Sequence, residues 1–145
     1  KVLEYLSRQK SLAFTDDELP EGFLLITADT VVIAENEILG KPKDRADAIR
    51  MMHILSGKSH HVVTGVTVRS KDKIETFSAN SEVTFAPLDE EEMAYYVDQY
   101  KPYDKAGAYG IQEWIGYVGI SGLHGSFYNV MGLPTRMLYQ TLKNF

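Results

Sequence analysis

The stretch FLLITADTVVIAENEILGKPKD, residues 23–44, decides the fold of this chain. Seven of the eleven residues at 23–33 are large and apolar, a composition that predicts a buried strand. Asp29 lies in the middle of that run. An ionised carboxylate left unpaired away from water is costly. We therefore expect Asp29 to have a partner, to open onto a solvent-filled cleft or to bind a cation.

Helices are predicted on both sides of this strand. A helical period runs from the first residue to about residue 14, and Asp44 is a typical N-cap for a helix over 45–56 that ends near Gly57. Asp89 and Glu92 have the spacing of a capping box, which predicts another helix after them. Pro134 opens a last helix, whose expected inward-facing residues are Met137, Leu138, Thr141 and Leu142.

Strands alternate with these helices. AENE, at 34–37, reads as a turn, and ILGKP after it as a strand end or loop. Two β-branched runs separated by SKDK predict a hairpin between about 60 and 88. GYVGISG, at 116–122, is a candidate strand within a glycine-rich segment that begins at residue 101. The alternation predicts an α/β layered domain with a mixed sheet.

The bulk composition restricts the possible functions. With 145 residues, 44% of them hydrophobic, the chain is the size of one domain, 1–145. A net charge of -5 argues against a broad basic surface for nucleic acid or an anionic membrane. The absence of cysteine excludes thiolate zinc sites and thiol nucleophiles. We find no apolar run of the ~20 residues that span a bilayer and no signal sequence, and we expect a cytoplasmic protein.

Asp29, Thr30 and Lys41 are the first candidate site. A carboxylate can hold a divalent metal or take a proton from water, and a lysine can neutralise phosphate oxygens. The alternative is a structural Asp29 that caps a turn or pairs with a nearby lysine. Consecutive strand residues point to opposite faces, so Asp29 and Thr30 share a cleft only at a strand end or a bulge.

The second candidate is the segment YDKAGAYGIQ, in which Asp104, Lys105 and Gln112 project from a glycine-containing loop. The carboxamide of Gln112 offers both a donor and an acceptor and could read a base edge. An ordinary solvated loop is the alternative. The chain has no Walker-type glycine loop and no GxSxG motif.

Six segments together resemble the Maf family of nucleoside triphosphate pyrophosphatases. They occur in the family's order and cover nearly the whole chain: ITADTVV, ILGKPKDRADA, LSGKSHHVVTGVTV, VTFAPLDEEEMAYYV, DKAGAYGIQ and GSFYNVMGLP. The resemblance implies a two-lobed α/β fold around a mixed sheet, with a cleft between the lobes, and commonly a homodimer. It implies hydrolysis of a nucleoside triphosphate between its α and β phosphates, with magnesium or manganese as cofactor.

The resemblance also implies roles for individual residues. Asp29 would be the catalytic carboxylate that activates water or holds metal, and Lys10 and Lys41 would bind phosphates. The ADT and YGIQ motifs resemble the branch that acts on dTTP and UTP, in which Thr30 and Gln112 bear on base choice.

The chain departs from the family pattern at its start. The family opens with a strand and a Ser-x-Ser-Pro-Arg-Arg loop whose arginines bind the triphosphate, and Lys1 falls where the family's next helix begins. We expect that segment to belong to the protein, because its deletion would expose a sheet edge. The rival is a nucleotide-binding regulatory protein, in which turnover is absent from a truncated form because the arginine loop is missing. The resemblance links such a role to septum formation.

Overall fold

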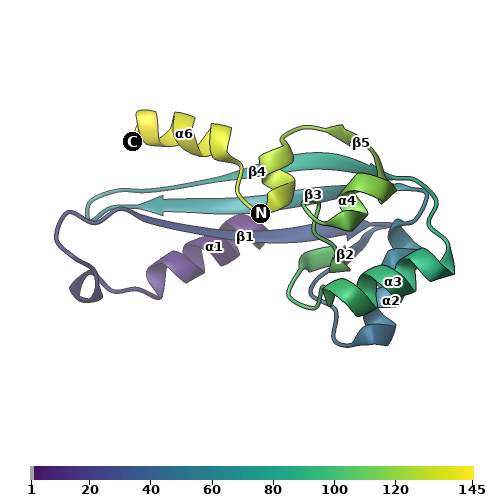
Figure 1. The fold of residues 1–145 in the computed structure, drawn as a ribbon. Coiled ribbons are helices and arrows are strands. Elements are labelled where there is room, and N and C mark those ends of the chain that lie inside the picture. Colours follow the sequence, from purple (N-terminus) through teal and green to yellow (C-terminus); the bar gives the residue numbers. More distant parts are fainter. Residues whose placement is uncertain (1) are drawn as a thin grey trace.

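The computed structural model describes residues 2–145 as a five-stranded sheet with helices on both faces (Figure 1). The strand order is β2-β1-β3-β4-β5. The strands are β1 (Leu25–Ala34), β2 (Glu37–Leu39), β3 (Ser59–Arg69), β4 (Ile74–Phe85) and β5 (Ile120–His124). The helices are α1 (Val2–Leu12), α2 (Arg45–Leu55), α3 (Glu90–Tyr100), α4 (Trp114–Gly119), α5 (Phe127–Met131) and α6 (Thr135–Lys143), with short 3-10 turns η1 (Asp16–Glu18) and η2 (Ala106–Ala108).

The α/β class is confirmed, but the described strands do not form a mixed sheet. All four pairings are antiparallel. The physical reason is the shortness of two connections, since a parallel pair needs a long crossover. β1 turns into β2 through Glu35 and Asn36, both left-handed with φ of 51° and 63°, as a two-residue hairpin requires. The predicted hairpin through SKDK joins β3 to β4.

β1 is an edge strand over most of its length. β3 pairs with residues 25–33 of β1 without interruption, whereas β2 pairs only with the last three residues, Val32–Ala34. Within residues 2–145, positions 25–31 therefore have no strand partner on the side away from β3. The continuous pairing of residues 25–33 with β3 fixes the position of the β1 side chains that line the site.

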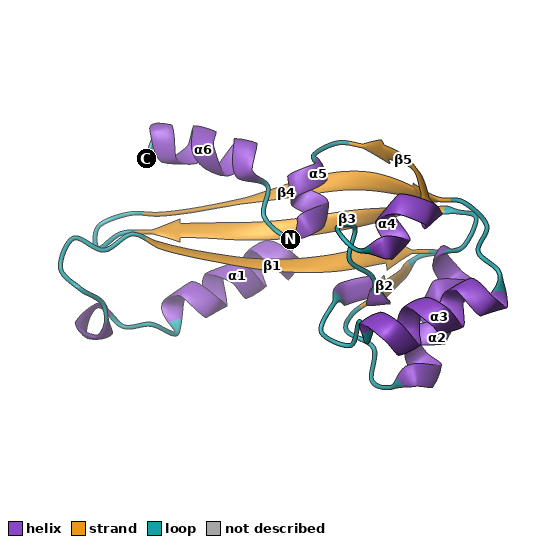
Figure 2. Ribbon diagram, viewed as in Figure 1, coloured by secondary structure: helices purple, strands orange, loops and turns teal. Residues whose placement is uncertain are grey.

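Two hydrophobic clusters match the expectation of two lobes. The larger one joins α2 and α3 to one end of the sheet and includes Leu39, Met52 and Tyr96. The smaller one contains Val66, Val68 and Leu138 under α6. Figure 2 shows α1 and α6 near the other end of the long strands, on opposite faces of the sheet.

α1 approaches the sheet very closely at Gly65. A methyl group at this position would lie 2.4 Å from the carbonyl of Leu3, so only glycine permits the contact. Ser7 and Thr67 then share a buried hydrogen bond of 2.8 Å between their hydroxyls. The contact holds α1, and with it Lys10, beneath β1.

The predicted helix caps are present. Asp44 accepts a hydrogen bond from the Asp47 N–H at 2.8 Å, and Asp89 and Glu92 form a reciprocal capping box. No helix among residues 2–145 is long and apolar enough to cross a membrane.

Two local predictions are wrong. The first half of GYVGISG is helical, and strand β5 begins only at Ile120. The helical conformation depends on a close backbone contact: a methyl group at Gly116 would lie 1.8 Å from the Ile111 carbonyl oxygen, so only glycine permits this turn of helix. In α6, Leu138 is buried as expected, whereas Met137 is 39% exposed because the small lobe covers only part of the helix.

Candidate active site

Asp29 is both paired and open to solvent. Its side chain is 28% exposed, and its Oδ1 lies 3.8 Å from the Nζ of Lys10 on α1. Lys10 also donates a 3.0 Å hydrogen bond to the carbonyl of Ala28. β1 is only half-buried around Asp29, so the carboxylate keeps contact with water. Two of the three expectations for this residue, a partner and an open cleft, are therefore met.

A cavity of about 540 Å³ brings the candidate residues together. Five segments line it: residues 28–32 of β1, Gly40 with Lys41, Val62 of β3, the loop from 104 to 113, and residues 130–132 at the end of α5. Asp29, Thr30, Lys41 and Gln112 are all lining residues. Lys10 lies outside the lining and reaches the site through Asp29.

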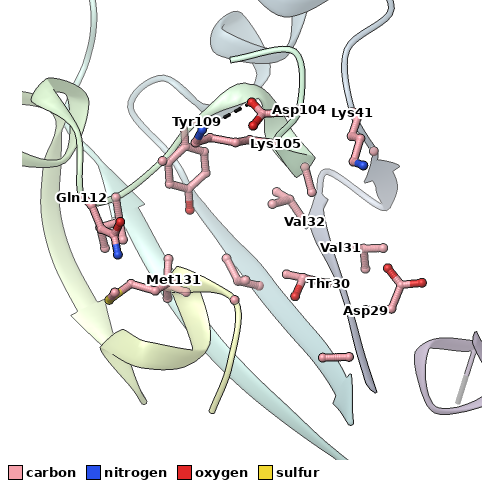
Figure 3. A pocket seen from close by; sticks show the side chains of 18 of the residues that line it. Asp29, Thr30, Val31, Val32, Lys41, Asp104, Lys105, Tyr109, Gln112 and Met131 are labelled. Carbon is pink, nitrogen blue, oxygen red and sulfur yellow. Dashed lines mark hydrogen bonds and ion pairs between the residues drawn. The ribbon is translucent and has the colours of Figure 1, made fainter. Parts of the chain in front are cut away.

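The cavity extends around both sides of β1. Figure 3 shows Asp29 and Val31 pointing to one side of the strand, and Thr30 and Val32 to the other. Asp29 and Thr30 line the same cavity although they lie on opposite faces of β1, and no bulge interrupts the pairing of this strand with β3. Thr30 is additionally held by a 2.9 Å hydrogen bond between its hydroxyl and that of Thr64.

The cavity consequently has two chemically different ends. Asp29 and Lys41 lie towards one side of β1, where their charges can meet a phosphate group or a cation. Gln112 and Met131 lie beyond Thr30 on the other side, with Ile111 and Val130 also in the lining. That end combines one carboxamide with apolar walls, the environment that a planar base requires.

The loop that carries Gln112 is part of the cavity wall and is not an ordinary solvated loop. Asp104 and Lys105 line the same cavity, and their side chains are 3.3 Å apart. The pKa of Asp104 is lowered below its usual value, mainly by a hydrogen bond from a backbone N–H and to a smaller degree by the hydrogen bond from the Lys105 ammonium group. Asp104 therefore stays ionised at neutral pH, next to a cation that partly offsets its charge.

Tyr109 and His60 support this loop and were not predicted as site residues. Tyr109 lines the cavity, is 6% exposed, and its hydroxyl is 2.6 Å from the Nε2 of His60. Burial lowers the pKa of His60 to about 4, so its ring is neutral at pH 7. Its Nδ1 is buried and has no partner within residues 2–145. Adjacency to His61 could not have revealed this pairing, because it joins residues far apart in the sequence.

Tyr96 and Glu113 form a second support, which local patterns also missed. The Tyr96 hydroxyl donates to the Oε1 of Glu113 at 2.5 Å and accepts from the Gly110 N–H at 2.9 Å. Tyr96 is fully buried, and burial raises its pKa above the usual value. The phenol is therefore protonated and available as a donor.

With this geometry in place, the comparison with known proteins is decisive. The family profile described as Maf-like protein matches residues 1–145. This chain belongs to the Maf-like family. The resemblance seen in the six sequence segments is thereby confirmed.

Several relatives of this Maf-like chain are named dTTP/UTP pyrophosphatase. The protein of that name from Porphyromonas gingivalis is 55% identical over 146 residues, which cover 100% of this chain and 73% of the relative. The one from Parabacteroides distasonis is 54% identical, with 97% of this chain and 72% of the relative covered. The one from Flavobacterium psychrophilum is 49% identical, with 99% and 73% covered.

The side chains that line the cavity of this Maf-like chain suit a divalent metal only if substrate phosphates and water supply most of its ligands. No group of three or more His, Cys, Asp or Glu side chains within the described part of the chain is arranged to hold a metal ion. Magnesium, however, commonly binds through one or two carboxylates together with substrate phosphates and water. Asp29, which is partly exposed and lines the cavity, suits that mode.

Proposed function

We propose that this protein is a nucleoside triphosphate pyrophosphatase that hydrolyses dTTP and UTP to the monophosphate and pyrophosphate. The observation that carries the proposal is the single cavity with a charged end at Asp29 and Lys41 and a carboxamide end at Gln112. A nucleotide has the same polarity, with anionic phosphates at one end and a base at the other. Relatives about half identical to this chain carry the name dTTP/UTP pyrophosphatase.

Asp29 is proposed as the catalytic carboxylate. Water adds to one phosphorus atom of the α–β anhydride, the bond from that phosphorus to the bridging oxygen breaks, and the monophosphate and pyrophosphate separate. Asp29 accepts the proton that the water loses. Lys10, 3.8 Å from Asp29, gives this carboxylate an ionic partner and leaves it exposed to the cavity.

Lys10 and Lys41 are proposed as phosphate-binding residues. Lys41 lines the cavity next to Gly40, where the absence of a side chain leaves the backbone accessible. Both ammonium groups can neutralise charge on phosphate oxygens as the anhydride is cleaved. A magnesium or manganese ion, held by Asp29 and by substrate phosphates, would supply further neutralisation of that charge.

Thr30 and Gln112 are proposed to bear on base choice. Uracil and thymine present a ring N–H between two carbonyl groups, which a carboxamide can match with one acceptor and one donor. Gln112 lines the end of the cavity that has apolar walls. Thr30 forms the boundary between this end and Asp29.

The test is to incubate the full-length protein with a nucleotide panel and with magnesium or manganese, and to measure pyrophosphate and monophosphate together. We expect both products in equal amounts from dTTP and UTP. The rival function, a nucleotide-binding regulator, predicts heat of binding by calorimetry without either product. Release of inorganic phosphate alone would contradict the proposed bond cleavage.

Two properties of the whole protein are also proposed. A homodimer is expected from the family resemblance, and light scattering of the purified full-length protein would measure its mass. A cytoplasmic location is consistent with a chain that lacks cysteine, and fractionation of the native cell would test it. A monomer, or a protein found outside the cytoplasm, would contradict these proposals.

A further inference from the structure

We propose that Tyr96 is a positioning residue for base selection, and that its buried hydroxyl holds Gln112 in the orientation that distinguishes uracil and thymine from cytosine. This inference rests on the proposed function, because it assigns a cause to the selectivity of the same site. Tyr96 is absent from the cavity lining, so it acts on the base only through the loop.

Gln112 occupies a tight turn. The N–H of Glu113 donates to the carbonyl of Gly110 at 3.0 Å, so Gln112 is the third residue of a four-residue turn. A turn of this size has few internal contacts and depends on its anchors for a fixed position. The anchors therefore determine where the carboxamide lies.

One hydroxyl anchors the turn on both sides of Gln112. Tyr96 accepts from the N–H of Gly110, two residues before Gln112, and donates to the carboxylate of Glu113, the residue after it. Tyr96 itself is 0% exposed, lies on α3 and belongs to the larger hydrophobic cluster. The Tyr96 hydroxyl thus attaches the turn to the larger hydrophobic cluster, against which Ile111 of the turn also packs.

The space around the turn is filled. A methyl group at Gly110 would lie 2.8 Å from the Cε of Lys105 and 2.9 Å from the Oε1 of Glu113. With this packing, the turn shifts only if the Tyr96 contacts change. Removing the hydroxyl leaves the Gly110 N–H and the Glu113 carboxylate without their partner, and both groups regain hydrogen bonds only by moving towards water. A displacement of about 1 Å is enough to misplace a recognition group.

Selectivity should change more than catalysis. Asp29 and Lys41 come from β1 and from the segment after β2, and neither contacts Tyr96 or the turn through any hydrogen bond or ion pair of the described residues. Loss of the Tyr96 hydroxyl therefore moves Gln112 and leaves the charged end of the cavity in place.

The experiment is the variant Tyr96→Phe in the full-length protein, with kcat/KM measured for UTP, dTTP and CTP. We expect the ratio of UTP to CTP to fall by about fivefold or more, as for the loss of one well-placed hydrogen bond. The matched control is Tyr95→Phe, since Tyr95 is the neighbouring residue, is 49% exposed and keeps its 4.9 Å ring contact with Trp114 when only the hydroxyl is lost. The UTP to CTP ratio of kcat/KM in Tyr95→Phe should equal that of the wild type.

Two Glu113 variants separate positioning from stability. Glu113→Gln retains an oxygen that accepts from Tyr96 and should keep most of the preference for UTP over CTP. Glu113→Ala should lose this preference to the same degree as Tyr96→Phe. Glu113→Ala also decides the question if Tyr96→Phe does not fold. A folded variant whose rates for all three nucleotides fall by the same factor, or do not fall, would overturn the inference. Wild-type protein without pyrophosphate release would instead refute the proposed function.

Discussion

Asp29 illustrates how one residue can satisfy a structural and a chemical requirement together. A carboxylate in an apolar strand needs compensation, and Lys10 provides it at 3.8 Å without closing the site, because the side chain remains 28% exposed. The structural alternative, pairing with a lysine, and the catalytic proposal are thus compatible. The partial exposure of Asp29 makes both possible.

We predict that Asp29→Asn in the full-length protein lowers kcat by about 100-fold or more, because the amide keeps the shape of the side chain but cannot accept the proton or hold a cation. The fold should survive the change, since the residue is only half-buried. Pyrophosphate release and circular dichroism would be measured on the same sample. A folded variant with near-normal turnover would refute the assignment of Asp29.

Gln112 is expected to control base choice more than rate. Cytosine presents an acceptor where uracil and thymine present an N–H, so the carboxamide oxygen would be left unpaired. In a dry pocket, an unmade hydrogen bond of this kind costs about 1 to 3 kcal/mol. Gln112→Ala should therefore narrow the UTP to CTP ratio of kcat/KM by about tenfold. An unchanged ratio would show that Gln112 takes no part in base recognition. The ratio of dTTP to CTP, measured on the same samples, is a second test of the same hydrogen bond.

At the scale of elements, α1 depends on a buried arginine at the end of β3. Arg69 is 8% exposed and donates to the hydroxyl and carbonyl of Ser11 and to the carbonyl of Phe14. It also pairs with Asp16 at 3.0 Å. Ser11 lies in the last turn of α1, and Phe14 and Asp16 follow the helix, where unpaired carbonyls need donors. Arg69 thus connects the element that carries Lys10 to the central sheet.

We predict that Arg69→Met lowers the free energy of unfolding by about 2 kcal/mol or more, because the buried hydroxyl and carbonyl of Ser11 lose their donor and the exposed Phe14 and Asp16 lose a partner. Chemical denaturation would measure the change. Arg50→Met is the control, since Arg50 is 49% exposed and pairs only with Glu37 and Asp47 at the surface, where ion pairs contribute at most about 1 kcal/mol. Equal destabilisation by the two variants would contradict the role given to Arg69.

At the scale of the whole molecule, His60 should link stability to pH. Burial holds its pKa at about 4 in the folded state, whereas an unfolded chain has about 6.5, so only the unfolded state binds this proton between those values. The His60 contribution to stability is therefore fully present above pH 6.5 and decreases as the pH falls towards 4.

The free energy of unfolding should fall between pH 7 and pH 5 in the wild type. We predict that this fall is smaller in His60→Gln, by about 2 kcal/mol. The control is His61→Gln, because His61 is the adjacent residue and its side chain is 50% exposed. If the free energy of unfolding changed between the two pH values by the same amount in the wild type and in His60→Gln, another group would be the cause of the pH dependence.

Much of the architecture could be read from local patterns because its causes are local. Asp44 and Asp89 cap helices through neighbours three residues away, and the β3–β4 hairpin follows from two β-branched runs around a short turn. The candidate residues Asp29 and Lys41 were found in the same way, from a charge out of place in a strand and a lysine after a glycine. The region around Gly116 was misassigned because its conformation depends on a backbone contact that periodicity does not record.

The sequence by itself determined the elements, the caps and the residue types able to handle a nucleotide, since each follows from the properties of residues a few positions apart. Only the tertiary structure decided that Asp29 and Thr30 share one cavity from opposite faces of β1. It also decided that His60 and Tyr96 hold the loop before and around Gln112. The physical reason is that these contacts arise from strand pairing and core packing between distant segments, whose energies no local pattern contains.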